Sequence, residues 1–229
     1  MYVLHIANKN YSSWSLRPWV LMRALGLDFE EKLEPFSDGS SWNLFRRFSP
    51  TGLVPCLIDD GMIIWDSMGI TEYLADNHPQ VWPADKAARA WARCAAAEMH
   101  SGFGNLREIC SMSVGIRVEL HNSTQSALEK DLKRINELWL QGLHKFGGPF
   151  LAGDKFTAVD AFYAPLMFRV QTYGLQLEPE AMAYIQHMLA QPAMQQWYNE
   201  ALHETWRDRT HEVYVTRYGR IVEDLRTGN

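Results

Sequence analysis

The sequence predicts a small mixed α/β domain followed by an all-helical domain, and three observations support this fold class. The first third of the chain alternates between short apolar runs and helical patterns, as expected for a small sheet with helices packed against it. Two prolines within five residues, Pro79 and Pro83, then indicate a linker. The pattern beyond them is helical. We therefore expect domains at 1–78 and 85–229, joined by residues 79–84.

The N-terminal domain begins with a mostly apolar stretch, residues 2–6, that predicts a strand. A helix should follow the polar loop after it. Because proline is tolerated in the first turn of a helix, Pro18 predicts that this helix begins between Ser15 and Pro18. Gly26 is placed to end it. Residues 28–33 then predict a second strand.

Residues 57–65 predict a β-hairpin, because two short apolar runs flank the turn residues Asp59-Asp60-Gly61. Pro55 lies just before the first of these strands, where its missing N–H costs no ladder hydrogen bond. The Val54–Pro55 bond is therefore a candidate cis peptide. Apolar residues at helical spacing predict a helix from Ser67 onward.

The second domain has a helical pattern along most of its length. Its helices are predicted at residues 85–112, 124–144, 157–173, 179–190 and 192–205. Thr157 and Asp160 have the spacing of a capping box, in which each side chain accepts from the other residue's backbone N–H. The charged tail, 211–229, is expected to be extended or partly helical.

Composition argues against several classes of partner. The 229 residues carry a formal net charge of -5 without a basic block, which disfavours nucleic acid and anionic membranes. No apolar run approaches the roughly 20 residues that span a membrane, and the start lacks a signal-peptide pattern, so we expect a cytoplasmic protein. Three dispersed cysteines predict no disulfide framework. The eight histidines show no close pairing, so no metal site is expected.

Four stretches of the chain match motifs of one known family. They are the loop Ser49–Leu57, the helix start Asp66–Leu74, the serine-containing loop Tyr11–Arg17 and the segment Phe150–Asp160. In this order and spacing, the chain resembles the cytosolic glutathione transferase superfamily, in particular its serine-type theta and zeta classes. The resemblance covers nearly the whole chain and implies a thioredoxin-like N-terminal domain, a helical domain contributing the electrophile pocket, and a homodimer.

The resemblance implies that glutathione is the co-substrate. A thiol ordinarily titrates near pKa 8.5 and reacts as its thiolate, so a hydroxyl donor and the positive end of a helix would favour the reactive form. Ser12 and Ser13 lie just before the predicted helix. The zeta-like spacing to Arg17 favours Ser12 and the theta-like spacing favours Ser13; we place Ser12 first and keep both. Arg17, by the same resemblance, orders the loop or supports the site.

The same resemblance assigns the parts of glutathione to the opposite side of the domain. The backbone of Val54, oriented by Pro55, would pair with the cysteinyl residue as a short added strand. Asp66 would bind the γ-glutamyl ammonium, although the family usually has Glu there. Ser67 and the helix N-terminus would hold the γ-glutamyl carboxylate. No motif selects the partner of the glycine carboxylate among Ser40, Ser41, Trp42 and Arg46.

The electrophile pocket is expected between the Ser12 loop and the helix after the linker. Side chains recur there at three- to four-residue spacing, typical of either a core face or a substrate wall: Met99, Phe103, Leu106, Arg107 and Cys110. Arg107 would suit an acidic substrate. Trp206 and Tyr214 are candidates for closing the pocket from the C-terminal side.

Three functions are consistent with these residues. The first is a glutathione transferase, acting in detoxification, that adds the thiolate to a small hydrophobic or acidic electrophile. The second is a glutathione-dependent cis-trans isomerase of the maleylacetoacetate type, although that class carries Ser-Ser-Cys-x-Trp-Arg where this chain has Ser-Ser-Trp-Ser-Leu-Arg at 12–17. The third is a non-catalytic protein that binds glutathione or another ligand.

Overall fold

The computed structural model describes residues 1–37 and 39–227, and its N-terminal part is built on a four-stranded sheet. The strands are β1 (Tyr2–Ile6), β2 (Phe29–Leu33), β3 (Cys56–Asp59) and β4 (Met62–Trp65), in the order β2-β1-β3-β4. β1 runs parallel to β2 and antiparallel to β3, and β3 pairs antiparallel with β4. The predicted mixed sheet is therefore confirmed.

The helices of this part are α1 (Ser13–Ala24), α2 (Trp42–Phe45) and α3 (Ser67–Asn77). α1 begins earlier than predicted, because the carbonyl of Ser12 already accepts the N–H of Leu16 at 3.2 Å. Pro18 consequently lies in the second turn rather than the first. Since proline has no N–H, the carbonyl of Trp14 loses its bond four residues on.

The predicted hairpin is confirmed, and its two-residue turn consists of Asp60 and Gly61. Both have positive φ angles, 45° and 86°, as a turn of the primed type requires. The Val54–Pro55 peptide bond is cis, as predicted. After the hairpin, Asp66 rather than Ser67 caps α3, because its Oδ1 accepts the N–H of Met68 at 2.8 Å.

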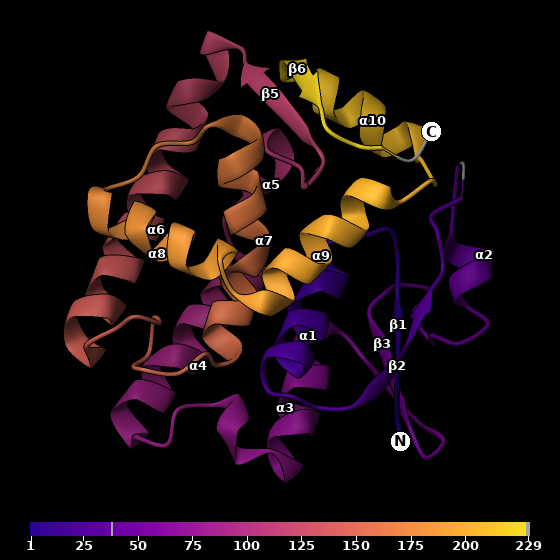
Figure 1. Ribbon diagram of the computed structural model, residues 1–229, viewed down its shortest axis with the longest axis vertical. Coiled ribbons are helices and arrows are strands. Elements are labelled where there is room, and N and C mark those ends of the chain that lie inside the picture. The colour runs from indigo at the N-terminus through magenta and orange to yellow at the C-terminus, as the bar shows by residue number, and fades with distance from the viewer. Residues whose placement is uncertain (38, 228–229) are drawn as a thin grey trace.

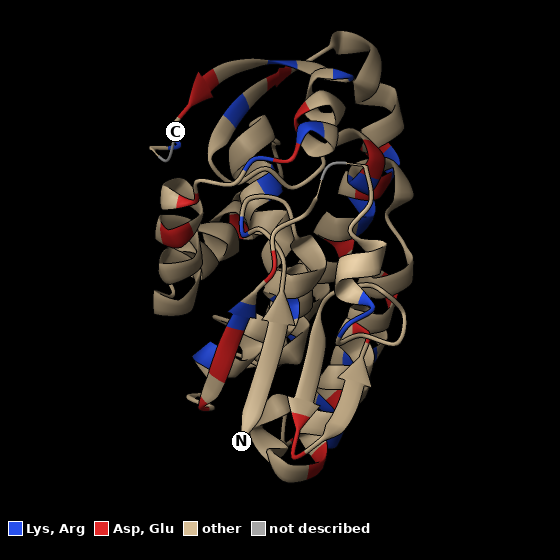
Figure 2. Cartoon of the chain, turned by 90° about the vertical axis from the view of Figure 1, so that its right-hand side faces the viewer, with Lys and Arg blue, Asp and Glu red and all other residues tan. Residues whose placement is uncertain are grey.

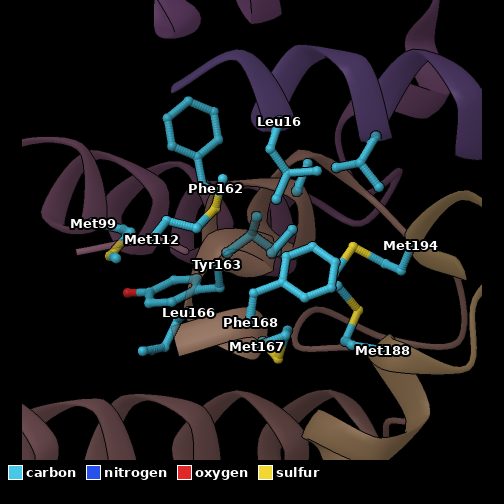
Figure 3. Packing of buried hydrophobic residues seen from close by; sticks show 14 of the residues in the cluster. Leu16, Met99, Met112, Phe162, Tyr163, Leu166, Met167, Phe168, Met188 and Met194 are labelled. Atoms are coloured by element: carbon cyan, nitrogen blue, oxygen red, sulfur yellow. The ribbon is translucent and has the colours of Figure 1, made fainter. Parts of the chain in front are cut away.

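The second part of the chain is helical, as predicted, and follows the short 3-10 helix η1 (Pro79–Val81). Its helices are α4 (Lys86–Ser101), α5 (Gly104–Ile109), α6 (Gln125–Phe146), α7 (Ala158–Tyr173), α8 (Pro179–Leu189), α9 (Pro192–His203) and α10 (Arg209–Thr216). α7 lies at the centre, packed against α1 and α4 (Figure 1). Almost all of its side chains are buried, including Phe162, Tyr163 and Phe168 (Figure 3).

α7 begins at the predicted capping box. Asp160 Oδ2 accepts the N–H of Thr157 at 2.9 Å, and Oδ1 accepts the N–H of Leu151 at 3.0 Å and the hydroxyl of Tyr184 at 2.9 Å. This buried carboxylate therefore joins the start of α7 to the preceding loop and to α8. It fixes the central helix against its neighbours.

The single helix predicted over residues 85–112 is wrong, because the chain breaks between α4 and α5. Phe103 adopts a left-handed conformation with φ of 60°. The Arg107 guanidinium donates to the carbonyl of Gly102 at 2.9 Å and to that of Met99, so it satisfies carbonyls at the end of α4. The helical periodicity of the sequence does not predict this cap, because the side chain folds back across the break.

A two-stranded ladder in the second part was not predicted. β5 (Ile116–Leu120) pairs antiparallel with β6 (Gly219–Asp224), which lies in the tail expected to be extended or partly helical. α10 precedes β6, so the described part of the tail has both helix and strand, and residues 228–229 lie outside the described residues. Figure 2 shows basic and acidic residues interspersed along the chain.

Candidate functional site

The loop before α1 carries the two candidate serines into a cavity of about 440 Å³. Ser12 is the N-cap of α1 and Ser13 is its first residue, so both lie at the positive end of the helix. The Ser12 hydroxyl donates to Ser15 Oγ at 2.7 Å. The Ser13 hydroxyl has no hydrogen-bond partner in residues 1–37 and 39–227. Ser13 therefore has the hydroxyl that is free to serve a ligand.

The C-terminal segment holds this loop in place. Buried Glu204 accepts the N–H of Lys9 at 2.7 Å, the N–H of Asn10 at 3.2 Å and the Asn10 side-chain amide at 3.1 Å. The Tyr11 hydroxyl donates to Glu212, which also forms an ion pair with Arg226. The serines are thus positioned by residues almost 200 positions further along the chain.

Val54 lines the same cavity as the serines. Neither its N–H nor its C=O is hydrogen-bonded to another residue in the described part of the chain. Unpaired backbone groups of this kind can pair with an extended peptide. The cis bond to Pro55 leads directly from this residue into β3.

The N-terminus of α3 has a second group without a partner. The Ser67 hydroxyl is buried and makes no hydrogen bond to any described residue. Asp66, at φ of 69°, uses Oδ1 to cap the helix, while its Oδ2 lies 3.5 Å from Nε2 of His100. Burial lowers the pKa of His100, which favours its neutral form. At neutral pH this Asp66 oxygen therefore has no charged partner within ion-pair distance among the described residues, although Arg17 attracts the carboxylate from further away.

Arg17, Arg107 and Arg169 lie close enough to repel one another, and none of them forms an ion pair with a described acidic residue, although Asp66 exerts a weaker attraction on Arg17. Arg17 is almost completely buried, stacks on Trp14 at 4.2 Å, and none of its three nitrogens is hydrogen-bonded. Arg107 stacks on the same ring at 4.9 Å, and Arg169 donates to the carbonyl of Cys110 at 2.9 Å. Arg107 and Arg169 line the cavity, whereas Arg17 does not.

This arrangement concentrates positive charge in a poorly solvated place. Burial, then repulsion from Arg107 and Arg169, lowers the pKa of Arg17 well below its ordinary value. Burial and the charge of Arg107 lower the pKa of Arg169 to about 10. A bound anion would offset both effects, since buried charges are stabilised by opposite charge.

The predicted electrophile pocket is only partly where the sequence suggested. Arg107 and Tyr214 line the cavity. Met99, Phe103 and Cys110 are buried in the core and do not line it, so we withdraw them from the pocket. The helix break turns Arg107 toward the cavity while these neighbours pack inward.

Trp42, Ser40 and Ser41, the candidates near the glycine end, line a second cavity of about 390 Å³ next to the first. Arg46 is not part of its wall, because its guanidinium donates to the carbonyl of Pro50. Trp206 is exposed and lines neither cavity. Ser40, Ser41 and Trp42 therefore remain in the candidate site.

Several residues of the first cavity have no signal in the sequence: Ser111, Met112, Arg169, Thr210 and His211. They come from the loop after α5, from α7 and from α10. No local motif contains them, because they meet only through the packing of those elements.

The two buried cysteines, Cys56 and Cys110, are unsuited to thiolate chemistry in the folded protein. Burial raises the pKa of Cys56 to about 11 and that of Cys110 to about 12, so both stay protonated near neutral pH. The described residues contain no group of three or more His, Cys, Asp or Glu that could hold a metal ion. None of the described helices is long and apolar enough to cross a membrane.

Comparison with known proteins defines the family. The model of the glutathione S-transferase N-terminal domain matches residues 11–77, and that of the C-terminal domain matches residues 118–208. Together these matches cover more than half of the chain. The chain therefore belongs to the cytosolic glutathione transferase superfamily, which confirms the resemblance inferred from its motifs.

Three similar proteins illustrate the relationship. A probable maleylacetoacetate isomerase from Caenorhabditis elegans is 26% identical over 179 residues, covering 77% of this chain and 82% of its own. Glutathione S-transferase GstA from Escherichia coli O157:H7 is 28% identical over 199 residues, which cover 79% of this chain and 90% of its own. A glutathione transferase homologue from Burkholderia, solved with bound glutathione, has 26% sequence identity and a TM-score of 0.63. The match covers 87% of this chain and 97% of the homologue.

Proposed function

We propose that this protein is a glutathione transferase in which the Ser13 hydroxyl stabilises the glutathione thiolate. The observation that carries the proposal is the free hydroxyl of Ser13 at the N-terminus of α1, while Ser12 donates to Ser15. A donated hydrogen bond and the helix dipole both favour the charged form of a thiol. Ser12 serves as the alternative donor if its hydroxyl turns away from Ser15.

The remaining unpaired groups suit the rest of a tripeptide. The free N–H and C=O of Val54 match the backbone of a cysteinyl residue. The orphan hydroxyl of Ser67 can donate to the γ-glutamyl carboxylate, and Asp66 Oδ2 can accept from the γ-glutamyl ammonium. Trp42 and the serines before it border the cavity into which the glycine end would extend.

The co-substrate proposed here is a small electrophile that carries a carboxylate. Arg107 and Arg169 line the cavity, Arg17 is close enough to be repelled by both, and none of the three forms an ion pair with a described acidic residue. Chlorodinitrobenzoate and chlorodinitrobenzene form a matched pair of electrophiles that differ by one carboxylate. We expect Arg107→Gln to lower kcat/KM for the acid about 10-fold, the worth of one charge-assisted hydrogen bond, and to affect the neutral compound much less.

Isomerisation of a cis-unsaturated dicarboxylic acid is a second candidate activity. The arginine-lined cavity favours it, as does the similarity to a probable maleylacetoacetate isomerase. Such a reaction would regenerate glutathione, whereas transfer would consume it. Monitoring free thiol during turnover of a cis-dienoic acid therefore distinguishes the two activities.

We also propose that the protein is a homodimer. Large apolar side chains are exposed on β4, where Met62, Ile63 and Trp65 are 54%, 45% and 47% exposed. Such a cluster typically marks a protein interface. Sedimentation equilibrium tests this point, and a monomer at all concentrations would contradict it.

The serine mechanism is tested by titrating the ultraviolet absorbance of the bound thiolate against pH. We expect Ser13→Ala to raise the pKa of bound glutathione toward about 8.5, the value of a free thiol, and Ser12→Ala to raise it less. The opposite order would assign the role to Ser12. If the wild-type protein binds no glutathione at millimolar concentration, the proposed function fails.

A further inference from the structure

A histidine supported by a buried carboxylate lies on the wall of the serine cavity. His211, in the first turn of α10, lines both this cavity and the neighbouring one. Its Nδ1 lies 2.6 Å from Oδ2 of Asp208, whose side chain is only 4% exposed. The same carboxylate oxygen accepts the backbone N–H of His211 at 2.9 Å, so Asp208 holds both the helix start and the ring.

The imidazole orientation is fixed from several sides. Its ring stacks on Tyr11 at 5.0 Å and on Phe36 at 4.9 Å. α10 is itself anchored, since Tyr214 donates to Glu108 at 2.7 Å and Glu212 accepts from the Tyr11 hydroxyl. A ring held this firmly behaves as a preorganised group rather than a mobile surface side chain.

The hydrogen bond to Asp208 also selects the tautomer. A carboxylate accepts, so Nδ1 carries the proton and Nε2 of the neutral ring presents a lone pair. Nε2 has no hydrogen-bond partner in the described part of the chain. A carboxylate–imidazole pair with a free nitrogen, bordering a cavity shared with a nucleophile's binding site, has the components of a general base.

We propose that His211, oriented by Asp208, accepts the proton of the glutathione thiol. This rests on the proposed function, because it requires glutathione in the serine cavity. The S–H bond breaks, its electron pair stays on sulfur, and the proton forms an N–H bond at Nε2, directly or through one water. The resulting imidazolium is stabilised by Asp208, and its proton then passes to the atom of the electrophile that gains electrons, or to solvent.

The surroundings allow a pH profile to be interpreted. The charged and titratable groups near His211 are Asp208, Tyr11, Glu212, Arg226 and Arg207 beside it, with Arg107, Arg169 and Tyr214 on the cavity wall. Burial, then the bond to Glu212, raises the pKa of Tyr11, which keeps it protonated. None of the neighbours just named carries an imidazole or a thiol, the group types that ordinarily titrate between about pH 6 and 9.

The decisive measurement follows proton release when glutathione binds in weakly buffered solution, together with thiolate absorbance. In the wild-type protein we expect thiolate to form without an equivalent release of protons near neutral pH, because His211 retains the proton. In His211→Ala, any thiolate that forms should release its proton to the buffer. Equal release per thiolate in both proteins would overturn the proposal.

Kinetics give a second readout. His211→Ala should lower kcat/KM with chlorodinitrobenzoate about 10²-fold near neutral pH, the lower end for a general base, and the deficit should shrink above about pH 8.5, where the thiol ionises unaided. Added imidazole should restore part of the activity through the vacated slot between Tyr11 and Phe36. Asp208→Asn, which keeps an oxygen acceptor but no charge, should cause a smaller loss.

The control is His203→Gln, because His203 is a second C-terminal histidine that lines neither cavity. It should match the wild-type protein in both assays. A pH-independent loss in His211→Ala without imidazole rescue would assign His211 a purely structural role and refute the proposal. If the wild-type protein does not bind glutathione at all, the proposed function fails instead, so the two failures are distinguishable.

Discussion

Arg17 illustrates the structural cost of burying a charged side chain. Its guanidinium is buried between Trp14 and Phe162, at 4.2 and 5.0 Å from their rings, and has no hydrogen-bond acceptor. The aromatic faces offset part of the desolvation. The nearby Arg107 and Arg169 add repulsion, which is reflected in the lowered pKa of Arg17. In the ligand-free protein this residue is therefore expected to be unfavourable for folding.

We predict that Arg17→Met leaves the free energy of unfolding of the ligand-free protein unchanged or raises it by about 1–4 kcal/mol, because an apolar side chain of similar length removes an uncompensated charge. The KM for chlorodinitrobenzoate should rise, since the cavity loses positive potential. Urea denaturation and steady-state kinetics measure these effects.

The matched control is Arg134→Met, since Arg134 is exposed and pairs with Glu98 at 2.7 Å. Loss of such a surface pair costs about 0–1 kcal/mol and should leave KM unchanged. A destabilisation by Arg17→Met larger than that of Arg134→Met would show that Arg17 is a structural residue rather than a charge held for a ligand.

At the scale of helices, α6 depends on a glycine for its approach to neighbouring elements. A Cβ atom on Gly142 would lie 2.4 Å from Cη2 of Trp91 in α4 and 2.5 Å from the carbonyl oxygen of Leu151. The carbonyl belongs to the loop that Asp160 fixes, so it cannot easily move. The glycine therefore permits α6 to pack closely against α4 and that loop.

We predict that Gly142→Ala lowers the free energy of unfolding by about 1–3 kcal/mol, the usual range for overpacking, although alanine favours helix. Gly69→Ala in α3 is the comparison, because nothing lies within 4 Å of its added Cβ. It should be neutral or stabilising by up to about 1 kcal/mol. Equal effects in thermal and urea denaturation would contradict this account of the packing.

At the scale of the whole molecule, the C-terminal segment connects the helical part to the loop that carries the candidate serines. Glu204 accepts three hydrogen bonds from Lys9 and Asn10, and Arg226 joins Glu212, Asp224 and the Tyr11 hydroxyl. The same segment also contains β6, which pairs with β5 of the helical part (Figure 1). The serine loop is thus stabilised by tertiary contacts rather than by its own sequence.

We predict that Glu204→Ala lowers the free energy of unfolding by about 3 kcal/mol or more, because it leaves three donors buried without an acceptor. Glu204→Gln keeps one acceptor oxygen and should cost less. The affinity for glutathione should fall in the same order, since the loop positions Ser12 and Ser13. An alanine variant as stable as the wild-type protein would show that water replaces the carboxylate.

The pH dependence of stability provides a further check on Glu204. Burial raises its pKa in the folded protein above the ordinary value, despite the bonds from Lys9 and Asn10. The folded state therefore retains a proton that the unfolded chain has already released. Relative to Glu204→Gln, the free energy of unfolding of the wild-type protein should fall as pH rises from about 4.5 to the raised pKa, and then level off.

The fold was predictable where local chemistry decides local structure. The sequence predicted the turn at Asp60-Gly61, the capping box at Thr157 and Asp160, and most of the helices. Each of these features depends on residues within a few positions of one another. The break at Gly102 and the strand pairing of residues 116–120 were not. Both depend on partners distant in the chain or on a side chain that folds back across a turn.

The sequence by itself determined the family and the two-part architecture, and it was enough to propose Val54, Pro55, Asp66 and Ser67 as glutathione-binding residues, because those motifs are contiguous. Only the tertiary structure decided which neighbours complete the site. It buried Met99 and Cys110, brought Arg169 and His211 to the serine cavity, and left the Ser13 hydroxyl free while engaging that of Ser12. The physical reason is that these residues belong to segments far apart in the chain, which meet only through tertiary packing, and such packing leaves no local pattern in the sequence.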